Sequence, residues 1–557
     1  MIERTKLRWN GWGWAAHEES VAARPEVWSW LAGEVGMPSL LATPARSLDE
    51  ITLPKSRLSA GERNVLRAVI GPDRVREDNY ERAFHAYGRS YHDLLRLRAG
   101  DIREAPDAVV YPRSTEEVLK LLAFASETSI AIVPYGGGTS VVGGVSANSG
   151  DFNAVLSVDL SGLNNLIAVD ADSHTATAEC GIYGPALEKA LEAVGMTLGH
   201  YPQSFEFSTL GGWIAHRGAG QQSGRYGKAE DWLVAAELAT PRGMLRDADF
   251  PASAAGPRIT DFIVGSEGAF GIITRATVRV HPLPETVETF AWLFHDFHKG
   301  ANAIREAEQS EVPVAMLRLS DAEETRFYRA FGETGRSRTV KDNIADVVLR
   351  IRGFRHQACV LIAQLEGTRE SVAFGKRQLG KIVRKHGAMA LGPAPGERWR
   401  ERRFHAPYLR DPMMDRGLGV DTVETATSWS KLPALYSAVQ KALSDAIVAS
   451  VPRPGARGIV MCHISHSYPD GASLYFTCIF PRTLNGGDLA QWRAIKRAAS
   501  DAIVANGGTI SHHHGVGEDH LPWMAQEKGA LGLDVLRAVK QTLDPRGILN
   551  PGKLIPQ

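Results

Sequence analysis

The sequence has little cysteine, and its four thiols do not stand in a metal-binding or disulfide pattern. Cys180, Cys359, Cys462 and Cys478 are scattered through 557 residues without a C-x-x-C spacing. This distribution argues against a disulfide framework and against a thiolate zinc site. We therefore expect a protein of a reducing compartment.

The chain also lacks an excess of charge of one sign. It contains 63 Lys and Arg residues and 63 Asp and Glu residues, so its formal net charge is zero. No surface for a polyanion is implied at the level of the whole chain, and we do not expect nucleic acid as a partner.

Long hydrophobic runs are missing as well. No apolar run approaches the roughly 18 residues of a membrane span, and the segment that starts at Met1 has no basic and then apolar leader pattern. The last four residues, 554–557, are not a peroxisomal address. We expect a soluble, cytoplasmic protein, whose only membrane contact is peripheral, at the inner face.

What the chain does contain is enough apolar sequence for two or three domains. It is 44% hydrophobic and 23% charged, the composition of a folded globular protein. Residues 1–105 are predicted to be mostly helical. Residues 106–284 alternate short β-branched runs with helical stretches, residues 285–505 combine amphipathic helices with a few strands, and residues 506–557 form a C-terminal segment. The predicted fold class is α+β.

Three glycine-rich loops lie within residues 106–284. The first, residues 134–140, follows a predicted strand and contains Gly136, Gly137 and Gly138 in succession. Because these glycines have no Cβ, their backbone N–H groups can converge on an anion such as a pyrophosphate. Alone, such a run is more often a flexible turn than a cofactor site. The other two loops, residues 203–213 and 265–274, favour a cofactor site.

In order and spacing, the three loops resemble the FAD-binding domain of the vanillyl-alcohol oxidase superfamily, which implies an FAD domain followed by an α+β cap. Relatives of this type can bind flavin covalently through a histidine of the first loop, but this chain has no histidine there, so noncovalent FAD is expected. The residues expected to bind FAD are Pro134, Tyr135, Gly136, Gly137, Gly138, Thr139, Ser140, Gln203, Ser204, Phe205, Glu206, Phe207, Ser208, Thr209, His216, Arg217, Gly218, Ala219, Glu267, Gly268, Ala269, Phe270, Gly271, Ile272 and Ile273.

Three consecutive histidines, His512, His513 and His514, precede Gly515 near the end of the chain. A solvated turn and a group of metal ligands are the alternatives to a catalytic role. Consecutive side chains of an extended segment point to opposite faces, so at most two of the three easily share one metal ion, and no metal is expected. We favour general acid/base catalysis, which suits an imidazole with a pKa of about 6.5.

Together with these motifs, nearly the whole chain resembles the alkyldihydroxyacetonephosphate synthase family, FAD enzymes that make the ether bond of ether lipids. The resemblance implies catalytic roles for Tyr475, Arg318 and the three histidines, and a substrate-binding role for Arg410. It also implies acyl-dihydroxyacetone phosphate and a fatty alcohol as substrates, exchanged without net redox change. We expect a homodimer. The motifs that carry the resemblance are residues 9–13, 132–140, 206–213, 265–268, 318–321, 409–411, 424–425, 471–476 and 511–517.

Each of these assignments has a structural alternative. Arg318 could hold a domain interface, Arg410 could form a surface ion pair with Asp411, and Tyr475 could be a core residue of its strand. Two other functions remain open. Related 2-hydroxy-acid dehydrogenases carry Gly-Glu-His-Gly where this chain has a histidine run, and a lipid-binding relative without catalysis is the third class.

Overall fold

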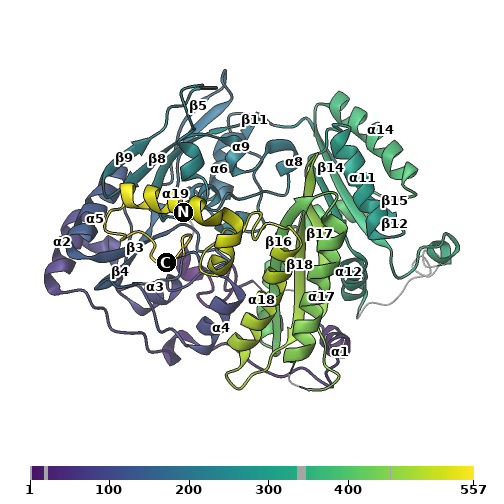
Figure 1. The fold of residues 1–557 in the computed structure, drawn as a ribbon, viewed down its shortest axis with the longest axis horizontal. Helices are drawn as coiled ribbons and strands as arrows, with labels where there is room; N and C mark the ends of the chain where they lie inside the picture. Colours follow the sequence, from purple (N-terminus) through teal and green to yellow (C-terminus); the bar gives the residue numbers. More distant parts are fainter. Residues whose placement is uncertain (1–2, 18–22, 335–346, 452, 557) are drawn as a thin grey trace.

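The computed structural model describes residues 3–17, 23–334, 347–451 and 453–556 (Figure 1). Two halves lie side by side, one built by the earlier part of the chain and the other by most of residues 285–505. The final residues cross back from the second half onto the first, so the C-terminal helix α19 (Met524–Leu543) lies across the half that contains the glycine loops.

The first half contains a sheet of order β1-β2-β4-β3 and another of order β5-β6-β10-β8-β9. Strands β2, β4 and β3 are parallel, whereas every pairing in the second sheet is antiparallel. The β-branched runs predict strands over residues 108–111, 130–134, 154–159, 176–179, 234–238 and 272–280, and the structure has strands at all six within one or two residues. The strands are β1 (Val75–Arg76), β2 (Ala108–Val110), β3 (Ile130–Tyr135), β4 (Ala154–Asp159), β5 (Leu166–Asp170), β6 (Thr175–Glu179), β8 (Leu233–Thr240), β9 (Gly243–Arg246) and β10 (Ile272–Arg279), with a small pair of β7 (Met196–Thr197) and β11 (His281–Pro282).

The second half is built on a seven-stranded antiparallel sheet of order β15-β12-β14-β13-β17-β18-β16. The sequence predicts only three of these strands explicitly, over residues 315–319, 359–365 and 473–480, which correspond to β13, β14 and β18. The strands are β12 (Thr286–Phe294), β13 (Met316–Ser320), β14 (Cys359–Gly367), β15 (Met389–Gly392), β16 (Leu418–Ser428), β17 (Ile459–Ser467) and β18 (Gly471–Pro481).

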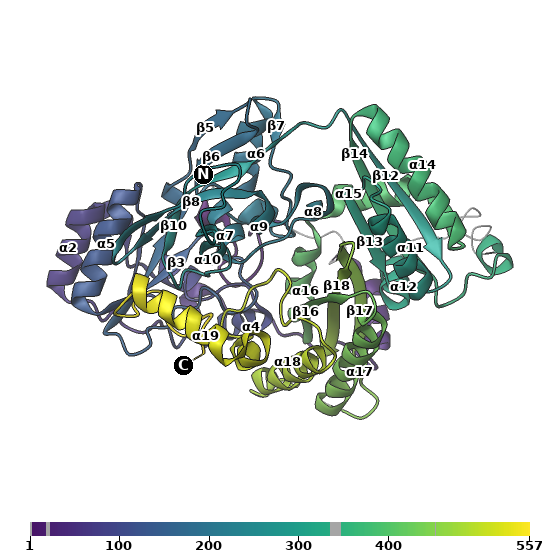
Figure 2. The ribbon, with the colours of Figure 1, turned by 45° about the horizontal axis from the view of Figure 1, so that its top comes forward.

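Helices pack on these sheets, and Figure 2 shows α11 and α14 beside one half of the seven-stranded sheet and α17 and α18 beside the other. The helices are α1 (Pro25–Glu34), α2 (Ala60–Ile70), α3 (Asn79–Phe84), α4 (Tyr91–Ala99), α5 (Thr115–Thr128), α6 (Gly184–Glu192), α7 (Leu210–Ala215), α8 (Ser223–Tyr226), α9 (Ala229–Trp232), α10 (Thr260–Ile263), α11 (Phe297–Gln309), α12 (Ala322–Glu333), α14 (Arg369–Lys385), α15 (Ala394–Arg402), α16 (Arg410–Met414), α17 (Leu432–Ser450) and α18 (Asp488–Ala505).

Two helix predictions had different outcomes. The stripe Leu435, Val439, Leu443 and Ile447 is fully buried on α17, which confirms that this four-residue spacing marks a face packed on the core. The C-terminal helix, in contrast, was predicted to begin near residue 534 and begins ten residues earlier. A kink at Gly529, where φ is +68°, separates the first part of this helix from the rest. Because the kink interrupts the helical period, the apolar pattern of the second part does not extend into the first.

The N-terminal segment contains α1 to α4, but much of it is neither helix nor strand, so it is less helical than predicted, and it is interwoven with the rest of the molecule. Its strand β1 pairs with β2. Near its beginning, Arg4 donates a hydrogen bond to the carbonyl of Gly136 in the first glycine loop. Farther on, the backbone N–H of Trp12 donates to Asp411, which lies on α16 of the second half. The segment therefore bridges both halves.

Among the described helices, none is both long enough and apolar enough to cross a membrane.

Candidate active site

One face of the seven-stranded sheet carries a row of polar residues. In the strand register, Glu424 of β16 lies opposite Tyr475 of β18, Tyr475 lies opposite His463 of β17, and His463 lies opposite Ser320 of β13. Their strand neighbours point the other way, and Leu474, for example, is fully buried. Because side chains alternate along a strand, the row is directed away from the helix-covered core.

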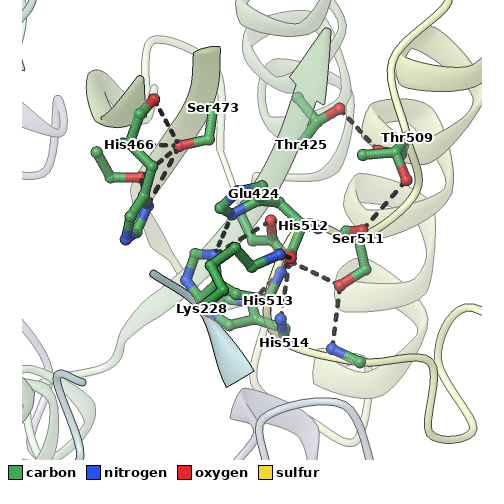
Figure 3. Close-up of polar contacts among 12 residues, drawn as sticks. Lys228, Glu424, Thr425, His466, Ser473, Thr509, Ser511, His512, His513 and His514 are labelled. Atoms are coloured by element: carbon green, nitrogen blue, oxygen red, sulfur yellow. Dashed lines mark hydrogen bonds and ion pairs between the residues drawn. The ribbon is translucent and has the colours of Figure 1, made fainter. Parts of the chain in front are cut away.

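Glu424 holds the loop that carries the three histidines (Figure 3). Its carboxylate accepts hydrogen bonds from the backbone N–H groups of His512, His513 and His514, at 2.7, 3.2 and 3.0 Å, and from the hydroxyl of Ser511 at 2.8 Å. Burial raises the pKa of this carboxyl, but the histidines and Ser511 outweigh burial and hold the pKa well below its ordinary value. The ionised carboxylate fixes the backbone from which the three rings project.

The histidine rings are directed toward different partners. His512 pairs through Nε2 with the hydroxyl of Tyr468 at 2.6 Å and through Nδ1 with His513 Nδ1 at 2.9 Å. Lys228, at the start of α9, donates to the carbonyl of His512. Burial lowers the pKa of His513 to about 3 and that of His514 to about 4. Near neutral pH these imidazoles are uncharged and can accept a proton.

Tyr475 lies among these rings. Its centroid is 5.0 Å from that of His463, 6.0 Å from that of His513 and 5.5 Å from that of His514, which meets it edge to face. Burial raises the pKa of Tyr475 to about 12, so the phenol is protonated near neutral pH. The alternative that Tyr475 is a core residue is wrong, because it faces the histidines while Leu474 and Phe476 fill the core.

Arg318 lies near the same row, beside Glu324 of α12. Its guanidinium donates to both oxygens of Glu324, at 3.3 and 3.0 Å, and approaches Nδ1 of His463 at 3.1 Å. All three residues belong to the second half of the molecule. The arginine therefore does not span the two halves as the interface alternative required, and it connects the row of polar residues to α12.

Arg410, the first residue of α16, is partly buried and keeps an unused donor. Its Nε has no hydrogen-bond partner within the described part of the chain. The alternative of a surface ion pair with Asp411 is wrong. Asp411 is buried, and it pairs with Arg8 and Arg98. A buried guanidinium with a free N–H suits an anionic group of a substrate.

The first two glycine loops lie against each other. A Cβ on Gly137 would lie 1.7 Å from the carbonyl oxygen of Phe207, and a Cβ on Gly136 would lie 2.4 Å from the hydroxyl oxygen of Thr209. Two backbones approach this closely only where a side chain is missing. The absence of side chains at Gly136 and Gly137 thus permits contact between the two loops.

Many of the predicted FAD-binding residues direct their side chains into the core. Tyr135, Phe205, Phe207, Ala269, Phe270, Ile272 and Ile273 are all buried. Phe205, for instance, stacks on Trp213 and Phe404, and Gln203 donates to the carbonyl of Arg403. The apolar residues of this set therefore contribute to cofactor binding through their backbone and not through their side chains. Ser208 bonds to Trp213, while Thr209 caps α7, at whose end lie His216, Arg217, Gly218 and Ala219.

The third loop joins the glycine loops to the histidine segment. The carboxylate of Glu267 accepts hydrogen bonds from the N–H groups of Val516, at 2.6 Å, and Gly517, at 2.7 Å. Asn550 donates to the carbonyls of Gly144 and Glu267. Among the described residues, Asn550 Oδ1 and His216 Nε2 are buried without a hydrogen-bond partner. Glycine loops with such unused polar atoms nearby fit a polar ligand such as FAD.

Comparisons with known proteins agree with this arrangement. Residues 106–249 match the family model described as "FAD binding domain", and residues 283–554 match "FAD linked oxidases, C-terminal domain". An alkyldihydroxyacetonephosphate synthase of Dictyostelium discoideum is 35% identical, over 99% of this chain and 94% of the relative. One from Caenorhabditis elegans is 31% identical, over 99% of this chain and 95% of the relative.

A solved structure of an alkyldihydroxyacetonephosphate synthase superposes on the whole chain with a TM-score of 0.84, at 32% sequence identity and with full coverage of both chains. The chain belongs to the alkyldihydroxyacetonephosphate synthase family. It is an enzyme with FAD as cofactor and with the α+β fold of a vanillyl-alcohol-oxidase-type flavoprotein.

The sequence did not reveal every member of the site of this synthase-family chain. Glu424 was noted only as part of a motif, while His463, Tyr468 and Lys228 were not noted at all. Pairing of β16, β17 and β18 would have placed Glu424 and His463 on either side of Tyr475. No sequence signal placed Lys228, which reaches the histidine loop from the other half of the molecule.

Proposed function

We propose that the protein exchanges the acyl group of acyl-dihydroxyacetone phosphate for a long-chain fatty alcohol, forming an ether lipid without net redox change. The proposal rests on the row of polar residues on the seven-stranded sheet and on the histidines that lie against it. A protonated Tyr475 on the sheet face lies against the uncharged rings of His513 and His514, whose segment bonds to Glu267 of the third loop.

This reaction requires removal of a proton from the carbon beside the substrate ketone, loss of a carboxylate, and deprotonation of the incoming alcohol. The uncharged imidazole of His513 or His514 accepts the proton at a ring nitrogen, and the phenol of Tyr475 donates or returns one. Arg410 binds the substrate phosphate through its free N–H, and Arg318 adds positive charge where the carboxylate leaves.

When bound, FAD would supply an electrophilic ring position for the substrate carbon, and the backbone of the first two glycine loops would hold its pyrophosphate. Glu267 keeps the histidine segment against that site through Val516 and Gly517.

The test is an anaerobic experiment with the purified holoenzyme, palmitoyl-dihydroxyacetone phosphate and hexadecanol. We expect the alkyl ether and free palmitate as products. We also expect the flavin absorbance to fall with the acyl substrate alone and to return when the alcohol is added, without an electron acceptor. Recovery only with an acceptor, together with bleaching by D-lactate or glycolate, would instead support a 2-hydroxy-acid dehydrogenase.

We propose, from the same resemblance, that the protein is a cytoplasmic homodimer that contacts the inner face of the membrane peripherally to obtain its lipid substrates. Light scattering on the purified protein tests the dimer. Fractionation of the source cells tests the location, and sedimentation with lipid vesicles tests the membrane contact.

A further inference from the structure

Three histidines from two distant segments converge at one edge of the catalytic site. His466, near the end of β17, meets His512 and His513, and one ring nitrogen from each residue lies within 4.8 Å of the other two. The ring centroid of His466 is 5.0 Å from that of His512 and 5.4 Å from that of His513. Only two members are consecutive in sequence, and the third comes from a strand.

The hydrogen bonds of His466 define which nitrogen is available. Its Nε2 lies 3.0 Å from the carbonyl oxygen of Gly220, and a carbonyl only accepts, so Nε2 carries the hydrogen. In the uncharged ring Nδ1 therefore has a lone pair, which now accepts from Ser465 at 3.0 Å. A metal-ligating histidine typically donates its other ring N–H to such a carbonyl.

His512 has a similar arrangement. Its Nε2 contacts the hydroxyl of Tyr468, and its Nδ1 points at Nδ1 of His513, 2.9 Å away. One hydrogen between these two nitrogens makes a hydrogen bond, and its replacement by a cation lets both lone pairs act as ligands. The buried carboxylate of Glu424, 3.6 Å from His513 Nδ1, offsets the charge of a cation, while Lys228 at the carbonyl of His512 opposes it.

We propose that His466, His512 and His513 bind one divalent transition-metal ion, of which Zn²⁺ is the best match. Three imidazole nitrogens and no thiolate suit zinc, cobalt or nickel, and a water molecule completes a tetrahedral zinc site. The ion inhibits the enzyme, because it occupies nitrogens that the proposed reaction needs for proton transfer. This second statement depends on the proposed function, whereas the binding site does not.

Binding is measured on the holoenzyme after treatment with a chelator. Calorimetric titration with Zn²⁺ is expected to give one site per chain, and Co²⁺ is expected to give the visible absorption of a tetrahedral complex. His466→Gln removes one ligand and is expected to weaken binding more than about tenfold. His386→Gln is the matched control, because His386 lies outside the cluster, paired with Glu306, and its loss should leave the affinity unchanged.

Tyr468→Phe provides a second variant in case His466→Gln does not fold. It removes the group that orients His512, and we expect weaker binding by up to about tenfold with the flavin spectrum retained. No stoichiometric binding to the native chain, or equal affinity in His466→Gln and the native chain, overturns the site. Tight binding without loss of ether synthesis overturns inhibition alone. If no ether synthesis is found, the proposed function fails while the titration still tests the site.

Discussion

The surroundings of Tyr475 follow from the alternation of side chains along its strand, β18. Leu474 and Phe476 fill the core beneath the sheet, so the residue between them faces the opposite side. On that side its ring meets His463, His513 and His514. Burial raises its pKa to about 12, which makes the phenol a proton donor that does not ionise spontaneously near neutral pH.

Tyr475→Phe keeps the ring and its packing but removes the hydroxyl. If the phenol transfers a proton, kcat for ether formation is expected to fall about 10²–10⁴-fold, the usual cost of losing a positioned acid or base. Tyr436→Phe is the matched control, because Tyr436 stacks on Phe476 and its hydroxyl bonds to Asp321. A native rate in Tyr475→Phe would exclude the phenol from proton transfer. Steady-state kinetics with unchanged flavin content provide the measurement.

Glu424 acts on the reaction through the backbone that it holds. Glu424→Gln replaces one acceptor oxygen by an NH₂ group that faces backbone N–H donors, so at least one buried N–H loses its partner, at a cost of about 1–3 kcal/mol. We expect a lower unfolding temperature and a larger fall in kcat than in substrate affinity.

Glu366→Gln is the control for this prediction, because Glu366 is a buried carboxylate on the same sheet, bonded to Gln222 and Gln364. This variant should lose stability without the selective loss of kcat. Equal kcat losses in both variants would mean that Glu424 has only a structural role.

At the scale of elements, the structure gives a second reason why the first glycine loop requires glycine. The run of three glycines predicted an open approach for a pyrophosphate. The structure adds that Gly137 lies against the backbone of the second loop, where any Cβ would meet the Phe207 carbonyl at 1.7 Å. A side chain there would push the two loops apart even before a cofactor binds.

Gly137→Ala is therefore sufficient to test the loop, and Gly137→Val should have at least as large an effect. We expect largely apo protein, measured as the ratio of flavin absorbance to protein absorbance. Gly332→Ala on α12 is the control, since no atom lies within 4 Å of the added Cβ. Full flavin occupancy in Gly137→Ala would contradict the assignment of this loop to the cofactor.

The buried carboxylate of Glu324 connects helix α12 to the row of polar residues through Arg318 and His463. Burial raises the pKa of Glu324, but the charge of Arg318 and then His463 outweigh it and lower the pKa to about 2, from an ordinary value of 4.5. A lowered carboxyl pKa contributes stability at pH values above 4.5 and loses this contribution as the pH falls toward 2.

The resulting prediction concerns Glu324→Gln. The difference in free energy of unfolding between the native chain and this variant should be largest at about pH 6 and should shrink steadily below about pH 4.5. Urea titrations at several pH values measure it. A difference that stays constant down to about pH 3 would show that the ionised form is not what stabilises the helix.

Much of this fold was predictable from local patterns, and the exceptions have physical causes. The short parallel strands are runs such as residues 130–134, whose burial on both faces makes them continuously apolar. In β16, by contrast, Thr422 and Glu424 lie on the face of the site, and Asp421 on the opposite face accepts a hydrogen bond from Trp492, so the strand has no clear apolar signal. The histidine run was evident as a motif, but its anchor Glu424 lies 88 residues away from His512, a separation that no local pattern spans.

At the scale of the whole molecule, the N-terminal and C-terminal segments connect the two halves. The N-terminal Arg4 reaches the carbonyl of Gly136, and Trp12 packs edge-on against Phe207 while its backbone bonds to Asp411 beside Arg410. The C-terminal segment crosses in the other direction and is held by Glu267 through Val516. The glycine loops and helix α16, which carries Arg410, are therefore positioned by the same connections.

We expect FAD to be bound noncovalently. The first loop, residues 134–140, contains no histidine to attach a flavin, and its glycines lie against the second loop. Unfolding separates the loops and so removes the site. We expect acid precipitation of the holoenzyme to release all of the yellow colour into the supernatant. Colour retained in the washed pellet would reveal a covalent attachment, and peptide mass spectrometry would then identify the attached residue.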